Sequence, residues 1–141
     1  MPFTAAQLAD LPSTYYRVSA KALIFDGDKL LIFKDKHGQW ELPGGGWEHD
    51  ESLDECLRRE LKEEMNVALS QVGEIELCWR NYPEGRAVKL CVAARATLAS
   101  HDFVPSDDDL VEARFVSLPF QASEQGAQTC VDAIWALSPA A

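Results

Sequence analysis

The spacing of hydrophobic residues changes along this chain, and each change marks a predicted strand or helix. Val18 to Phe25 and Leu30 to Phe33 are apolar runs separated by Asp26-Gly27-Asp28, which is typical of two strands joined by a tight hairpin. From Glu51 to Met65 the apolar residues recur with a helical period instead. The chain therefore combines strands with at least one amphipathic helix.

The order of these elements predicts one mixed α/β domain that spans residues 1–141. In chain order they are a helical turn at 4–11, strands at 18–25 and 30–33, an extended piece at 40–42, a helix at 51–65, strands at 72–80, 87–97 and 111–118, and a C-terminal helix around 130–135. Thr4 caps the first turn and Pro12 ends it, while Pro83 and Gly85 mark a turn between two strands.

The helix at 51–65 carries acidic residues on a side where apolar ones are expected. Its apolar face is broad and consists of Leu53, Cys56, Leu57, Leu61 and Met65. Glu60 and Glu64 are four apart, so they stack one above the other at nearly the angle of Leu53. Glu63 lies at the edge of this stripe beside Arg59. The pattern places three carboxylates on an arc that overlaps the core-facing side.

Carboxylates held together near a core need a partner. Each buried charge costs several kcal/mol unless it is paired. Arg59 can satisfy one of them, and a hard divalent cation, which prefers oxygen ligands, can satisfy the others. The alternative is a highly charged surface helix with a narrower apolar stripe.

A glycine-rich loop, Leu42-Pro43-Gly44-Gly45-Gly46, precedes this helix by a few residues. Glycine lets the backbone approach a ligand closely, so a carbonyl here could add an oxygen ligand to a metal. The start of the helix also offers a positive end for phosphate. The alternative is a tight loop that needs glycine only for positive φ.

Composition narrows the classes of function. The net charge of −10 argues against general nucleic-acid binding, which depends on Lys and Arg. No apolar run is long enough for a membrane span, and the N-terminus lacks a secretory signal, so we expect a cytoplasmic protein. The cysteines have no metal-site spacing and are predicted to pack as small hydrophobes; they are Cys56, Cys78, Cys91 and Cys130.

Together these residues resemble the Nudix box, G-x5-E-x7-R-E-U-x-E-E-x-G-U, where U is a bulky aliphatic residue. The matching positions are Gly45, Glu51, Arg59, Glu60, Leu61, Glu63, Glu64, Met65 and Val67. Asn66 replaces the box glycine, and asparagine is the usual second choice for a left-handed residue after a helix. Asp50 is expected to be a similar replacement in the loop. The likeness extends to Ala113–Leu118 and so covers most of the chain.

The resemblance implies the Nudix fold, a mixed β-sheet between helices. It also implies an enzyme that hydrolyses a nucleoside diphosphate linked to another moiety, with Mg²⁺ or Mn²⁺ as cofactor. By match to the box, Glu60, Glu63 and Glu64 would bind the metal with a backbone carbonyl of Gly44 or Gly45. Such an ion would also let an acidic site accept a polyphosphate substrate.

The same resemblance assigns catalytic roles. Glu51 would contact the metal or a water, Arg59 would orient Glu51, and Glu64 or Glu60 would be the general base. An acidic residue outside the box often contributes in the family, and the loop that holds Asp107, Asp108 and Asp109 is the candidate region; the alternative is a solvated loop.

Substrate choice lies outside the box. Several aromatic residues could stack on a base or could simply pack in the core or rim; they are Tyr15, Tyr16, Trp47, Trp79 and Phe103. Trp47 lies between the glycine run and the helix, so we predict that it borders the substrate cleft.

Two other classes of function are open. One is a Nudix-fold module that senses nucleotides without hydrolysis, although such modules usually lose box carboxylates that this chain keeps. The other is an isoprenoid diphosphate isomerase, whose additional cysteine and glutamate pair nothing here marks. A small-molecule substrate is expected in either hydrolase or sensor, and a homodimer is common in the family.

Overall fold

The computed structural model describes residues 4–10, 16–36, 38, 40–81, 89–102 and 110–117. The elements are α1 (Ala5–Ala9), β1 (Arg17–Leu23), β2 (Phe25–Asp26), β3 (Lys29–Asp35), β4 (Trp40–Glu41), β5 (Gly44–Gly46), α2 (Leu53–Met65), β6 (Leu69–Asn81), β7 (Lys89–Leu98) and β8 (Leu110–Ser117). The predicted C-terminal helix, the turn at Pro83 and Gly85, and the acidic loop with Asp109 lie outside the described residues.

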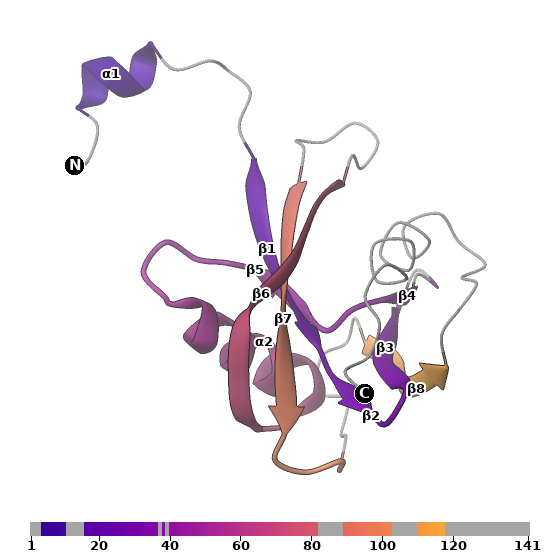
Figure 1. Ribbon diagram of the computed structural model, residues 1–141. Coiled ribbons are helices and arrows are strands. Elements are labelled where there is room, and N and C mark those ends of the chain that lie inside the picture. The colour runs from indigo at the N-terminus through magenta and orange to yellow at the C-terminus, as the bar shows by residue number, and fades with distance from the viewer. Residues whose placement is uncertain are drawn as a thin grey trace.

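The strands form two sheets (Figure 1). In the first, the order is β5-β1-β7-β6, with β1 parallel to β7 and antiparallel to β5, and with β6 antiparallel to β7. In the second, β3 pairs in antiparallel fashion with β2, β4 and β8. The first sheet is therefore mixed and the second is antiparallel, and the predicted α+β class is confirmed. Among the described helices, none is long and apolar enough to cross a membrane.

The first predicted hairpin is divided between the two sheets. Only Phe25 and Asp26 pair with β3, around a turn in which Gly27 has φ 62°. The rest of the apolar run is β1, which instead pairs with β5 and β7. Leu23 and Ile24 lie where the chain passes from one sheet to the other, and both are buried, each in a different hydrophobic cluster. The apolar run is therefore continuous in the sequence, where it looks like a single strand.

The glycine run forms strand β5, so the prediction of a loop was wrong. Gly44, Gly45 and Gly46 pair with Lys21, Ala20 and Ser19 of β1. Gly44 has φ 131°, and a Cβ added there would lie 2.0 Å from the carbonyl oxygen of Ala20. Glycine is a poor strand former, and here the close approach of β1 requires it.

The apolar face of α2 packs on the first sheet, as Figure 1 shows. Cys56, Leu57, Leu61 and Met65 are fully buried and contact small residues of β1 such as Ala20. Small side chains on the strand let the helix approach the sheet closely. The predicted apolar face of the helix is confirmed, and this packing fixes the direction in which its glutamates project.

Local signals fix both ends of α2. The Glu55 amide donates to Ser52 Oγ over 3.1 Å at the N-cap, and Asn66 ends the helix with φ 53° and ψ 36°. The left-handed conformation predicted for Asn66 is confirmed. The one predicted for Asp50 is wrong, because Asn66 is the only non-glycine residue with positive φ in the described part of the chain.

The cysteines only partly follow the prediction. Cys56 and Cys91 are buried, but Cys78 is exposed. Cys78 lies on β6 at the edge of its sheet, where side chains alternate between the core and solvent. An apolar run in an edge strand therefore does not imply burial of every residue in it.

Candidate active site

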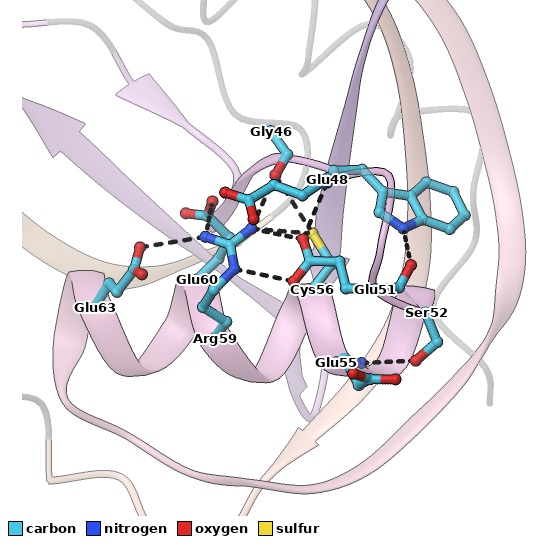
Figure 2. A network of polar contacts seen from close by, with 10 residues as sticks. Gly46, Glu48, Glu51, Ser52, Glu55, Cys56, Arg59, Glu60 and Glu63 are labelled. Carbon is cyan, nitrogen blue, oxygen red and sulfur yellow. Dashed lines mark hydrogen bonds and ion pairs between the residues drawn. The ribbon is translucent and has the colours of Figure 1, made fainter.

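Arg59 connects the start of α2 to the glycine strand (Figure 2). Its Nη2 lies 2.7 Å from Glu51 Oε1 and its Nε lies 3.0 Å from Glu51 Oε2, which makes a bidentate pair. Nη2 also donates to the carbonyl oxygen of Gly46 over 3.0 Å, and Nη1 donates to Glu60 over 2.9 Å. The pairing of Arg59 with Glu51 that the resemblance implied is present in the structure.

Glu51 is consequently held as an anion. Hydrogen bonds from Arg59, together with one from the Glu48 amide at 3.0 Å, lower the pKa of Glu51 to about 2. The Trp47 indole Nε1 donates to the backbone oxygen of Glu51 over 2.9 Å. Glu51 therefore links the segment between β5 and α2 to Arg59.

Glu60 lies against the glycine strand. A Cβ added to Gly45 would lie 2.6 Å from the Glu60 carboxylate carbon, so only glycine leaves room for this carboxylate. The Glu60 side chain is 14% exposed, and burial raises its pKa against the opposing effect of Arg59. The Glu60 carboxylate thus packs directly against the backbone of Gly45.

Glu64 lies one turn further along α2 and is more deeply buried. The Gly44 amide donates to Glu64 Oε2 over 3.3 Å. Burial raises the pKa of Glu64 to about 8, although Lys21 and the Gly44 amide both favour its charged form. Glu60 adds to the effect because it repels a second negative charge. The charged form of this carboxylate is therefore costly unless a cation lies near it.

Lys21 is a residue of the site that the sequence analysis missed. It is 7% exposed on β1, directly opposite Gly44, and its Nζ lies 3.5 Å from the carbonyl oxygen of Leu42. Its charge favours the ionised form of Glu64. A lysine between alanines in an apolar strand, Ala20-Lys21-Ala22, was the available signal, because buried lysine is rare without a partner.

Glu63 differs from the other two predicted metal ligands. Its side chain is 57% exposed and contacts Arg59 Nη1 at 3.4 Å, at the rim of the site. Within the described residues, no three acidic, histidine or cysteine side chains are already grouped as a metal site. The structure brings Glu60 and Glu64 to the glycine strand and leaves Glu63 outside. Buried carboxylates beside a strand free of Cβ atoms fit a hard cation that takes oxygen ligands.

A cavity of about 670 Å³ opens beside Glu60. Trp47, which is predicted to border the substrate cleft, lines this cavity and also packs partly against the core. Three further residues with polar side chains line the cavity and were missed as site residues; they are Arg17, Glu48 and His49. Their signal was weak, because exposed polar residues flanking a strand or a turn are common. Asp109, the other predicted substrate contact, lies outside the described residues.

The sequence matches the family model of the NUDIX domain over residues 15–124. The fold is similar to that of a MutT NUDIX hydrolase from Burkholderia pseudomallei, with a TM-score of 0.71 and 19% identity over 85% of this chain and 98% of that one. A MutT protein from Methanosarcina mazei Go1 has a TM-score of 0.71 and 21% identity over 86% and 94% of the two chains. A UDP-X diphosphatase has a TM-score of 0.70 and 15% identity over 94% of this chain and 68% of that one. No curated sequence matches the chain significantly.

The fold and the site thus define a small α+β protein with buried carboxylates on a helix that faces a glycine strand. The family match covers most of the chain, so this protein belongs to the NUDIX family. Its predicted family, fold and enzyme class are confirmed: it is a Nudix hydrolase, and members of this family generally use divalent metal ions.

Proposed function

We propose that this protein hydrolyses the diphosphate bond of a nucleoside diphosphate linked to another moiety, and that it does so with Mg²⁺ or Mn²⁺. The observation that carries the proposal is that Glu60 and Glu64, both half-buried, lie together against a strand of glycines. That arrangement favours binding of a hard cation and exposes backbone beside it. The structural similarity to a UDP-X diphosphatase agrees with a substrate of this class.

The protein's own residues have distinct tasks in this mechanism. Glu60 and Glu64 would hold the cation, with Glu63 and a carbonyl of Gly44 or Gly45 completing its oxygen ligands. When bound, the ion neutralises charge on the phosphoryl oxygens and lowers the pKa of a water. Arg59 fixes the direction of the Glu60 carboxylate through the contact at 2.9 Å.

Proton transfer falls to a buried carboxylate. Glu64 is held at the glycine strand, where the Gly44 amide donates to its Oε2 over 3.3 Å, and a general base must lie within hydrogen-bond reach of the water that attacks there. We therefore assign Glu64 as the general base, with Glu60 as the other candidate. Glu51 acts through Arg59 by holding it in place, as the bidentate contact indicates.

A coupled screen of phosphate release tests the proposal: pyrophosphatase is added for the triphosphates and alkaline phosphatase for the other substrates, because the reaction itself yields pyrophosphate or phosphomonoesters and these enzymes convert them to phosphate. The substrates are nucleoside triphosphates, nucleotide sugars, ADP-ribose and dinucleotides, each with Mg²⁺, with Mn²⁺ and with EDTA. We expect turnover of at least one substrate that EDTA abolishes and excess Mg²⁺ restores. Glu55→Gln is the matched control, because Glu55 is exposed on the opposite side of α2. Full activity in EDTA contradicts the mechanism, and binding of a nucleotide without any turnover favours a sensing module instead.

A further inference from the structure

The cavity beside Glu60 is lined by a guanidinium and by aromatic groups that the proposed metal chemistry does not use. Tyr16 and Arg17 come from the start of β1, and Trp47 and His49 come from the segment between β5 and α2. Its volume of about 670 Å³ falls within the range of pockets that hold small organic ligands, roughly 300–1,000 Å³. A nucleotide is therefore of suitable size for it.

Arg17 differs from Arg59 in what its guanidinium contacts. Arg59 is engaged by Glu51, Glu60, Glu63 and the Gly46 carbonyl. Within the described residues, no hydrogen bond or ion pair engages the Arg17 guanidinium, and its Nη2 lies 3.7 Å from the position that a Cβ of Gly46 would take. Arg17 is thus a cation beside the carboxylate site whose donors face the cavity, and such donors match phosphoryl oxygens.

The aromatic groups of the cavity also differ. The indole of Trp47 donates to the backbone of Glu51 and packs against the core, so its position is fixed. Tyr16 is 49% exposed, the most exposed large hydrophobic side chain in the described ranges of the chain. An exposed ring next to a phosphate-binding cation can stack on a base, because every nucleobase offers a flat π-face.

We propose that this cavity binds the nucleoside end of the substrate, with the Arg17 guanidinium paired to a phosphoryl oxygen and the Tyr16 ring stacked on the base. The proposal rests on the proposed function, which places the diphosphate at Glu60 and Glu64. Glu48 and Glu60 also line the cavity, so Arg17 supplies the positive charge that offsets them. The enzyme would then favour substrates with a nucleobase over diphosphates that lack one.

Equilibrium binding of a ligand that cannot be hydrolysed tests the role of Arg17. The probe is the α,β-methylene analogue of ADP with Mg²⁺, measured by titration calorimetry. We expect Arg17→Ala to weaken binding about tenfold or more, as for loss of a charged hydrogen bond, and Arg17→Lys to restore part of it. The control is Arg95→Ala. Arg95 lies on β7 opposite Leu23, at the far end of β1 from Arg17, and pairs with Glu76 over 2.7 Å. Equal effects of Arg17→Ala and Arg95→Ala overturn the proposal.

A second comparison tests the stacking. Methylenediphosphonate carries the same diphosphate core without a nucleoside, so we expect it to bind less tightly than the ADP analogue. Tyr16→Ala should reduce this difference roughly tenfold, and Tyr16→Phe, which keeps the ring, should retain it. Equal binding of the two probes to the unmodified protein contradicts the assignment of Tyr16.

These experiments distinguish failure of the proposed nucleoside-binding cavity from failure of the proposed hydrolysis. Binding of the ADP analogue that depends on Arg17, in a protein that releases no phosphate from any substrate, supports the cavity and contradicts the proposed hydrolysis. Metal-dependent turnover with a KM that Arg17→Ala and Tyr16→Ala leave unchanged supports the hydrolysis and contradicts the cavity.

Discussion

The acidic segment at residues 51–64 runs from just before α2 to its last turn, and its two ends solve the same electrostatic problem in different ways. At one end, Arg59 forms a bidentate pair with Glu51, whose pKa falls to about 2. At the other end, Glu64 has a backbone amide and a buried lysine as neighbours, and its pKa rises to about 8. One carboxylate is stabilised as an anion by the protein itself, and the other is not.

This difference indicates which end is built for structure and which for binding. The Arg59 network holds the segment between β5 and α2 in place and needs nothing further. The Glu64 end keeps a costly charge that an added cation would stabilise. Proteins often carry such locally unfavourable features at functional sites. The predictions below separate the two ends by measuring activity and stability on the same variants.

The largest effect is expected for Glu64→Gln. Removal of the charge should reduce turnover by roughly 10³-fold, the range seen for loss of a catalytic electrostatic group. The same change should leave the metal-free protein at least as stable, because glutamine has the shape of glutamate without the buried charge. Phosphate release and thermal unfolding in EDTA measure the two effects. A large loss of stability with normal turnover would show that Glu64 belongs to the structural end.

Gly45→Ala should come next in size. The new Cβ would lie 2.6 Å from the Glu60 carboxylate and displace it, and a misplacement of about 1 Å can reduce the rate 10²-fold. Stability should change little, because the displaced atoms are the end of a flexible side chain. Gly44→Ala is the contrast: it places a Cβ 2.0 Å from backbone at φ 131°, and it should cost more than about 1 kcal/mol of unfolding free energy. If both variants lose the same unfolding free energy, Gly45 is needed for the backbone of β5 and not to make room for Glu60.

The pH dependence of stability should also distinguish the two ends. The pKa of Glu64 is raised from 4.5 to about 8, so between these values the folded protein holds a proton that the unfolded chain has released. Metal-free stability should therefore fall as the pH rises from about 5 to 8, and Mg²⁺ should reduce the fall. Glu51 acts in the opposite direction: its stabilisation is complete above pH 4.5 and is lost toward about 2. Unfolding temperatures measured across this pH range, with EDTA or with Mg²⁺, report both effects. A metal-free unfolding temperature that does not fall between pH 5 and about 8 contradicts the comparison.

Sequence predicted the acidic helix well, because its signals are local. The apolar face, the Asn66 end and the pairing of Arg59 with Glu51 all depend on spacing within about fifteen residues. The helix starts two residues later than predicted, at Leu53 after the Ser52 cap. The glycine run and the split hairpin were misjudged because their strand pairing is set by β1, far along the chain. Lys21 and Arg17 were missed for the same reason: they reach the site only when β1 pairs with β5.

The smallest effect is expected for Glu63→Gln. Glu63 is more than half exposed and contacts Arg59 at 3.4 Å at the rim of the site, so it lies between the two ends that the comparison separates. A carboxylate that must turn inward to reach a cation contributes less than one already buried beside it. We expect turnover to fall about tenfold, with the apparent Mg²⁺ affinity reduced and metal-free stability unchanged. Phosphate release as a function of Mg²⁺ concentration measures this. A loss equal to that of Glu64→Gln would mean that all three glutamates act as one unit, and the boundary between structural and binding ends would then lie at Arg59 itself.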